Sequence, residues 1–359
     1  MMAAQIYTAA IPAMRSIADC TNFSLTVAPY IDQLYDLPQQ LLQSYNHPTE
    51  LLDIYLRTNP LISGLAFAMF ISPLCLLVSQ INRNYSQVDR LWSLLPTIYN
   101  AHFVTYAHLT GVPTTTLDNL LAVSVVWSLR LTFNYARKGG YNIGSEDYRW
   151  NILKAYVPGW VFFLFNVIFI SFIQNILLFS IATPTYIILL ASSVGKATMS
   201  SADLIFARGL MALILVEFFA DQQQWNYQNA KKTYLETAKV PFTYEQDDLD
   251  RGFVVTGLWS WSRHPNFAAE QGIWVGLYQW GCLKSDTLYN WTCVGAISYV
   301  LLFQGSTWLT ELLTAQKYPE YKEYQRRVGK FLPKLGTSLP GDFSDQKAKP
   351  KVEKMKAIK

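Results

Sequence analysis

A polar motif in the C-terminal third of the chain combines the residue types that bind or protonate a ligand. Between Gly257 and Glu270 the sequence reads GLWSWSRHPNFAAE, which sets an Arg, a His, an Asn and a Glu among three aromatic residues. An apolar run over 268–283 continues from it. Polar groups at a membrane boundary are costly to desolvate, so such a cluster predicts a binding or catalytic site.

The spacing within this motif predicts where its polar groups lie relative to a helix. Pro265 favours a turn before it and the start of a helix after it. Asn266 and Glu270 are four residues apart and therefore share one face of that helix. Arg263 and His264 stand at its entrance as a basic pair, although His264 is also compatible with a hydrogen-bonded histidine at the membrane interface.

A second polar cluster, Glu217 and Asp221, closes an apolar run. These residues are also four apart, so they share a helical face where like charges repel. A ligand hydroxyl, amide or cation between them would explain the spacing. Two carboxylates wetted at the interface are the alternative.

Basic residues near the same boundary are candidates for binding an anionic cofactor. Arg130 lies inside an apolar run and either snorkels to the interface or faces inward toward a carboxylate or phosphate. Arg149 follows in the segment EDYRW, together with Arg137 and Lys138 upstream. An ordinary basic cytosolic loop is the simpler explanation for these three.

Tyrosines recur near the C-terminus. Tyr318, Tyr321 and Tyr324 are three residues apart, which predicts one face of a cytosolic helix that closes a cofactor pocket. An interfacial belt of aromatic residues is the alternative.

The composition indicates that helices within a lipid bilayer position these polar groups. Hydrophobic residues make up 51% and charged residues only 15% of the 359 residues, against roughly 25% charged in soluble domains. Runs long enough to span a bilayer, at roughly 20 residues each, lie at 60–80, 156–181, 203–220 and 290–311. Weaker ones are 91–110 and 117–135. The run 268–283 would pair with 290–311 as a short hairpin, and 184–195 is too short to assign.

Charge asymmetry orders these segments. If 60–80 ends in the cytosol, the basic loops 136–155 and 221–267 and the basic tail all lie on that side. We therefore predict an all-α, polytopic integral membrane helix bundle of about seven transmembrane helices, with the N-terminus outside and the C-terminus cytosolic. Residues 1–58 form an N-terminal extension, 59–335 the membrane-embedded domain and 336–359 a disordered basic tail.

Several site classes are excluded by pattern. The chain contains no G-x-G-x-x-G after a strand, no P-loop, no nucleophile elbow and no H-E-x-x-H. Its four Cys have no metal-ligand spacing, so no metal site is predicted and the thiols are expected to be free and buried. We predict no nucleic-acid partner.

Five motifs in order give a family resemblance. They are YSQVDRLWSLLP, WSLRLTFNYARKGGY with EDYRW, ADQQQW, GLWSWSRHPNFAAE and YPEYKEYQRRVGKFLP, and they run from Asn82 to Pro333. Together they resemble the steroid 5-alpha reductase-like membrane family of unknown function, which carries a reductase-type C-terminal domain. The resemblance implies a membrane protein, expected in the endoplasmic reticulum, that binds NADPH from the cytosol and reduces a carbon–carbon double bond of a steroid-like or other lipid.

The resemblance also implies roles for particular residues. Asp221 and Asn266 would hold the dinucleotide and Glu270 would lie near the substrate, with Glu270, Tyr278 or another Tyr as the acid that polarises an enone. With the other polar clusters, the expected cofactor-binding set is Arg130, Arg149, Asp221, Arg263, His264, Asn266, Tyr318 and Tyr321.

One difference from the steroid reductases leaves the identity of the cofactor undecided. True steroid reductases carry an Arg and several His late in the last span, whereas Phe303–Trp308 of this chain contains neither. The motif also resembles that of the isoprenylcysteine and phospholipid methyltransferases, which bind S-adenosylmethionine. The alternatives are thus a membrane methyltransferase and a non-catalytic lipid-binding or scaffold protein.

Overall fold

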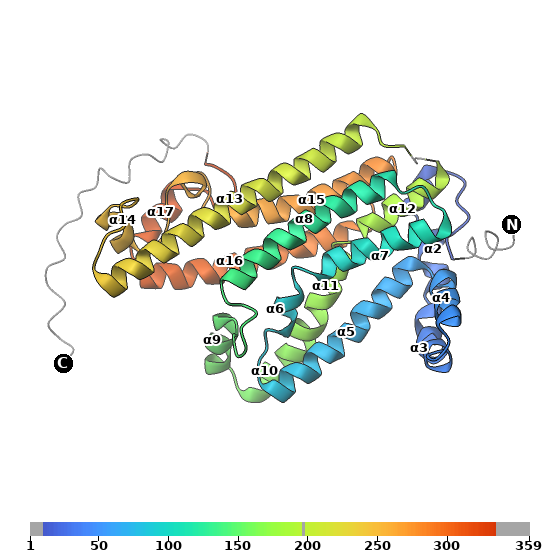
Figure 1. The fold of residues 1–359 in the computed structure, drawn as a ribbon, viewed down its shortest axis with the longest axis horizontal. Coiled ribbons are helices and arrows are strands. Elements are labelled where there is room, and N and C mark those ends of the chain that lie inside the picture. Colours follow the sequence, from blue (N-terminus) through green and yellow to red (C-terminus); the bar gives the residue numbers. More distant parts are fainter. Residues whose placement is uncertain (1–9, 196–197, 335–359) are drawn as a thin grey trace. The chain divides into compact units, whose positions relative to one another are not determined.

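The computed structural model describes residues 10–195 and 198–334, and these residues fold into helices joined by short turns (Figure 1). No β-strand forms in these two ranges, and Ser262 and Gly329 make an isolated parallel backbone bridge. The all-α prediction is confirmed. The predicted basic tail, 336–359, lies outside the described residues.

The N-terminal part consists of short helices. Their bounds are η1 (Ile17–Thr21), α2 (Phe23–Thr26), η2 (Ala28–Tyr30), α3 (Gln33–Gln43) and α4 (Pro48–Arg57). Pro48 occupies the first turn of α4, where its missing N–H removes no helical hydrogen bond.

Longer helices follow α4. Their bounds are α5 (Pro60–Asn82), α6 (Gln87–Leu91), α7 (Leu95–Thr110), α8 (Thr115–Arg137), α9 (Tyr148–Tyr156), α10 (Gly159–Phe165), the π-helical η3 (Asn166–Ile173), α11 (Gln174–Ser180), α12 (Pro184–Val194), α13 (Ser201–Thr237), α14 (Gln246–Arg251), η4 (Gly257–Ser260), α15 (Pro265–Lys284), α16 (Cys293–Lys317) and α17 (Tyr321–Arg327). All the predicted apolar runs are helical, and α15 begins at Pro265 as the sequence predicts.

Three segments are long and apolar enough to cross a membrane. They are Pro60–Asn82, Gly159–Val194 and Cys293–Lys317, fewer than the seven or so expected from the sequence. The shortfall has physical causes, since α7 has only 16 residues and the apolar part of α13 contains Asp203, Arg208 and Glu217. The segment too short to assign from sequence, 184–195, forms α12, which is mostly buried.

The chain divides into two compact units. The first comprises Met1–Leu215 and Glu270–Gln304, and the second comprises Val216–Ala269 and Gly305–Lys359. Each therefore combines segments that are distant in sequence, and α13, α15 and α16 contribute residues to both.

The core of the first unit is aromatic and aliphatic. Tyr99 and Phe103 of α7, Trp127 of α8 and Tyr186 of α12 are all nearly inaccessible to solvent. Phenolic and indole groups need partners when they are buried. Tyr186 finds them by donating to the Thr26 carbonyl at 2.8 Å and accepting from the Asn59 carboxamide at 2.9 Å.

The second unit has two smaller cores. One groups Tyr227, Leu249, Val254 and Trp259. The other packs Phe253, Val255, Tyr321, Tyr324 and Val328 around α17. Both include residues from the loop over 252–264, so this loop is fixed on both sides by apolar contacts.

Gly295 provides a test of packing in the first unit. A Cβ atom there would lie 2.3 Å from the carbonyl oxygen of Ser180, which is backbone and cannot move aside easily. We expect Gly295→Ala to lower the free energy of unfolding by about 1–3 kcal/mol, measured by thermal unfolding in detergent. Gly305→Ala in the same helix is the matched control, because nothing lies within 4 Å of its added methyl. Equal stability of the two variants would contradict this packing.

Candidate functional site

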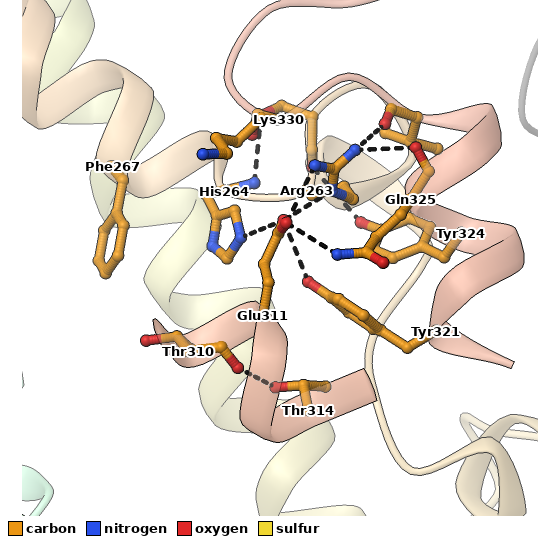
Figure 2. A network of polar contacts seen from close by, with 12 residues as sticks. Arg263, His264, Phe267, Thr310, Glu311, Thr314, Tyr321, Tyr324, Gln325 and Lys330 are labelled. Atoms are coloured by element: carbon orange, nitrogen blue, oxygen red, sulfur yellow. Dashed lines mark hydrogen bonds and ion pairs between the residues drawn. The ribbon is translucent and has the colours of Figure 1, made fainter. Parts of the chain in front are cut away.

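The polar motif is built around a buried carboxylate, Glu311 of α16 (Figure 2). Arg263 donates to both of its oxygens, from Nε to Oε1 at 2.7 Å and from Nη2 to Oε2 at 3.1 Å. His264 Nε2 lies 2.9 Å from Oε1 and Gln325 Nε2 lies 2.9 Å from Oε2. A bidentate arginine with further donors is the arrangement that compensates a carboxylate for leaving water.

Backbone contacts hold Arg263 and His264 in place. Their amides donate to the carbonyls of Gly329 and Lys330 at 2.9 and 3.1 Å. Arg263 Nη1 also donates to the carbonyls of Gln325 and Val328. The extended segment before α15 is therefore fastened to the segment after α17.

Burial favours the neutral form of His264 in this cluster. It lowers the pKa of the imidazole, and the hydrogen bond to Glu311 opposes that shift only in part. Because a carboxylate only accepts, the ring proton lies on Nε2. Arg263 and His264, which we predicted as cofactor contacts, thus direct their polar atoms at Glu311 and the backbone, an arrangement that suits positioning residues.

A second pair in the same unit is Asp221 with Asn266. Asn266 Nδ2 donates to Asp221 Oδ1 at 3.0 Å, and its own oxygen accepts from the Phe267 amide at 3.0 Å. Glu217 lies one turn before Asp221 on α13, and both side chains are buried at 4% exposure. Two residues that the resemblance assigns to cofactor binding, Asp221 and Asn266, thus contact each other at the first turn of α15.

The loop before α15 is locked onto α13. The Leu258 amide donates to Gln223 Oε1 at 2.9 Å, and Trp259 Nε1 donates to the Ala220 carbonyl at 3.1 Å. Gly257 has a φ of +64° and a Cβ atom there would lie 2.6 Å from the Gln223 amide. Only glycine suits this position, which fixes the entry of the motif beside Asp221.

Glu270 lies in the first unit and is enclosed by donors. Its Oε2 accepts from Trp127 Nε1 at 2.9 Å, and its Oε1 accepts from Trp274 Nε1 at 2.8 Å and the Tyr299 hydroxyl at 2.6 Å. Arg130 Nη2 adds an ion pair at 3.5 Å. Both oxygens therefore accept hydrogen bonds, so Glu270 anchors the side chains of α8, α15 and α16 that donate to it.

Tyr299 was missed by the sequence analysis. It stands 29 residues from Glu270 in an apolar helix, and no local pattern marks it. Tyr278, the other predicted acid, is buried with its hydroxyl accepting from the Asn290 amide at 3.2 Å.

The three arginines of the expected cofactor-binding set, Arg130, Arg149 and Arg263, are each paired with a carboxylate. Arg130 is 8% exposed and faces inward, so the snorkelling alternative is wrong for this residue. Arg149 makes a bidentate contact with Asp147, whose charge raises the arginine's pKa although burial alone would lower it. With Arg263 bound to Glu311, all three predicted arginines are charge-compensated.

The tyrosine repeat is split by Pro319. Helix α17 begins at Tyr321, so Tyr318 precedes it and the prediction of one helical face for all three tyrosines is wrong. Tyr321 faces Glu311 at 3.5 Å. The Tyr318 hydroxyl lies 2.7 Å from Lys231 Nζ. Burial alone would raise the pKa of Tyr318, but the positive charges of Lys231 and Lys317 lower this pKa overall.

Within residues 10–195 and 198–334, no group of three or more His, Cys, Asp or Glu side chains is arranged to hold a metal ion. Cys20, Cys75 and Cys282 are buried, and Cys293 is partly buried.

Comparison with known proteins gives a family and a relative. A family model described as a protein of unknown function (DUF1295) matches residues 75–328. An uncharacterized protein of the fission yeast Schizosaccharomyces pombe is 40% identical over 329 residues, which cover 91% of this chain and 94% of that protein. No solved structure gives a significant match.

Because Glu311 is the counter-ion of Arg263, we expect replacement of its carboxylate by a neutral group to lower the free energy of unfolding strongly. Glu311→Gln would leave Arg263 buried without a counter-ion, which costs about 3–5 kcal/mol in comparable sites. Thermal unfolding in detergent measures the loss, and the exposed pair partner Glu236→Gln should stay within about 0.5 kcal/mol of the parent. A Glu311 variant as stable as the control would show that the cluster does not hold the fold.

Proposed function

The chain belongs to the DUF1295 family, whose function is unknown, and from that premise we propose that the protein is a membrane oxidoreductase that uses NADPH to reduce a carbon–carbon double bond of a lipid. The substrate class is a steroid-like or other apolar lipid with an enone or comparable activated alkene. We place it in the endoplasmic reticulum membrane with the C-terminus in the cytosol, where a soluble cofactor has access.

The observation that carries the proposal is the Asp221–Asn266 pair. The resemblance to steroid 5-alpha reductases assigns the dinucleotide to a helix-end Asp and a motif Asn, and here the two side chains are 3.0 Å apart. A carboxylate accepts from ribose hydroxyls and a carboxamide offers both donor and acceptor to an amide, so the pair fits the nicotinamide riboside part of the cofactor. The hydrogen bond from the Leu258 amide to Gln223 holds the loop before α15 against α13, beside this pair.

The membrane arrangement we propose retains about seven spans. The three strongly apolar segments would be joined by α7, α8, α13 and α15, in which several charged residues are buried and paired while Arg208 of α13 is exposed. Asp203 of α13, for example, accepts from Trp280 Nε1 at 2.7 Å and pairs with Lys284 at 3.3 Å. Buried, paired charges of this kind are tolerated within membrane bundles.

In the reaction, NADPH would supply a hydride to one alkene carbon, and an acid of the protein would protonate the other or polarise the conjugated carbonyl. Glu270 would orient Trp127, Trp274 and Tyr299 through its two occupied oxygens. The proton would then come from a tyrosine, with Tyr278 and Tyr299 as the candidates. Glu270 contributes by fixing the Tyr299 hydroxyl at 2.6 Å.

A second candidate, an S-adenosylmethionine-dependent methyltransferase of a lipid or prenylated substrate, is favoured by one observation. The phosphates of NADPH need cations, yet Arg130, Arg149 and Arg263 are each neutralised by a carboxylate. S-adenosylmethionine carries no phosphate, and its ribose would suit Asp221 equally well. Cofactor binding therefore separates the two candidates.

We expect the detergent-solubilised protein to bind NADPH saturably and S-adenosylmethionine not at all, measured by titration calorimetry. Asp221→Ala and Asn266→Ala should each raise the Kd for NADPH about tenfold, because each removes a hydrogen-bonding partner worth about 1.4 kcal/mol. The exposed residues Asp247 and Asn119, changed to Ala, are the matched controls.

Three outcomes would contradict the proposal. Binding of S-adenosylmethionine alone would favour the methyltransferase. Binding of neither would favour a non-catalytic lipid-binding protein. Unchanged NADPH affinity in both variants would reject the roles of Asp221 and Asn266.

A further inference from the structure

An apolar cavity of about 650 Å³ lies in the first unit, remote in sequence from the cofactor residues. Its walls come from α3, α4, α5 and α7, and they contain no charged side chain. The lining residues are Leu37, Pro38, Leu41, Leu42, Leu51, Ile54, Tyr55, Thr58, Ser63, Gly64, Ala66, Phe67, Phe70, Ile98, Tyr99 and His102. Cavities of this size and polarity are typical of sites for small apolar ligands.

Exposed apolar side chains line part of this cavity. Phe67 and Phe70 belong to α5, one of the candidate membrane spans, and both are exposed. Leu41 and Leu42 of α3 are exposed along the same cavity. A hydrocarbon chain from the bilayer could therefore enter without crossing water.

One end of the cavity is polar but neutral. The Tyr55 hydroxyl lies 2.9 Å from His102 Nδ1, and His102 Nε2 lies 2.8 Å from the Pro60 carbonyl oxygen. Because a carbonyl only accepts, Nε2 carries the ring proton and Tyr55 donates to Nδ1. No charge is available here to bind an ionised headgroup.

A second cavity of about 350 Å³ shares Ile54 and Thr58 with the first and is polar. Its lining includes the carboxamides of Gln33, Gln40 and Gln43 and the Ser44 hydroxyl. Its two charges neutralise each other, since Arg57 and Asp53 form an ion pair at 2.9 Å. Gln40 and Gln43 are exposed and their side-chain amides make no hydrogen bond within the described residues, so these amides are available.

We propose that these two adjoining cavities form one lipid-binding site, separate from the cofactor pair, for a neutral amphiphile with a single hydrocarbon chain and a hydroxyl-bearing headgroup. The chain occupies the apolar cavity. The headgroup hydroxyls bind the Gln40 and Gln43 carboxamides, which donate and accept as hydroxyls require. A monoacylglycerol has this chemistry, and the bilayer supplies it.

The test uses a photoreactive, alkyne-tagged monopalmitoylglycerol in phosphatidylcholine vesicles that contain the full-length protein. We expect saturable labelling of peptides from α3, α4 or α5, and at least fivefold weaker labelling by the phosphorylated, anionic analogue with the same chain. Ala66→Trp fills the apolar cavity and should reduce labelling at least fivefold. Ala122→Trp, an exposed alanine of α8 outside both cavities, should not reduce it.

A second variant keeps the test decisive if Ala66→Trp fails to fold. Gln40→Ala with Gln43→Ala changes only exposed side chains and should weaken labelling at least threefold at an unchanged unfolding temperature. Equal labelling of this variant and the parent would overturn the proposal. So would equal labelling by the neutral and anionic probes, or labelling spread evenly over all lipid-facing helices. None of these results depends on whether the protein binds NADPH.

Discussion

The cost of burying carboxylates in an apolar helical protein governs this structure. An ionised carboxylate removed from water is tolerated only when cations and hydrogen-bond donors replace the lost hydration. Both buried carboxylates meet this condition. Glu311 is contacted by Arg263, His264 and Gln325. Glu270 is contacted by Trp127, Trp274, Tyr299 and Arg130. Each carboxylate thereby ties together segments that are distant in sequence, within its own unit.

The cost of burying carboxylates distinguishes residues whose polar groups stabilise the fold from residues whose polar groups we propose to bind a ligand. Arg263 and His264 belong to the most prominent motif of the chain, yet their polar atoms are committed to Glu311 and to backbone carbonyls. Asn266 donates to Asp221 at 3.0 Å and is only partly buried. The proposed function therefore depends on this pair, while Arg263 and His264 support it by fixing the loop that leads into α15.

Local patterns in the sequence predicted the local parts of this arrangement. The helix that starts at Pro265 and the helical character of every apolar run were predictable, because they depend on neighbouring residues. Pairings across long separations were not, such as Glu311 with Arg263 at 48 residues or Glu270 with Tyr299 at 29. Length and hydropathy alone mark three candidate membrane spans, fewer than the seven or so expected from the sequence, because acidic residues reduce the apolar character of helices such as α13.

Isotope transfer tests the central claim, lipid reduction by NADPH, most directly. Vesicles containing the protein are incubated with a total lipid extract and NADPH that carries deuterium at the transferable position of the nicotinamide, and the lipids are analysed by mass spectrometry. We expect a lipid that has gained one deuterium and one proton, and about tenfold less of it with Asp221→Ala at an NADPH concentration well below the Kd. Incorporation of a labelled methyl group from S-adenosylmethionine, or no protein-dependent change in any lipid, would contradict it.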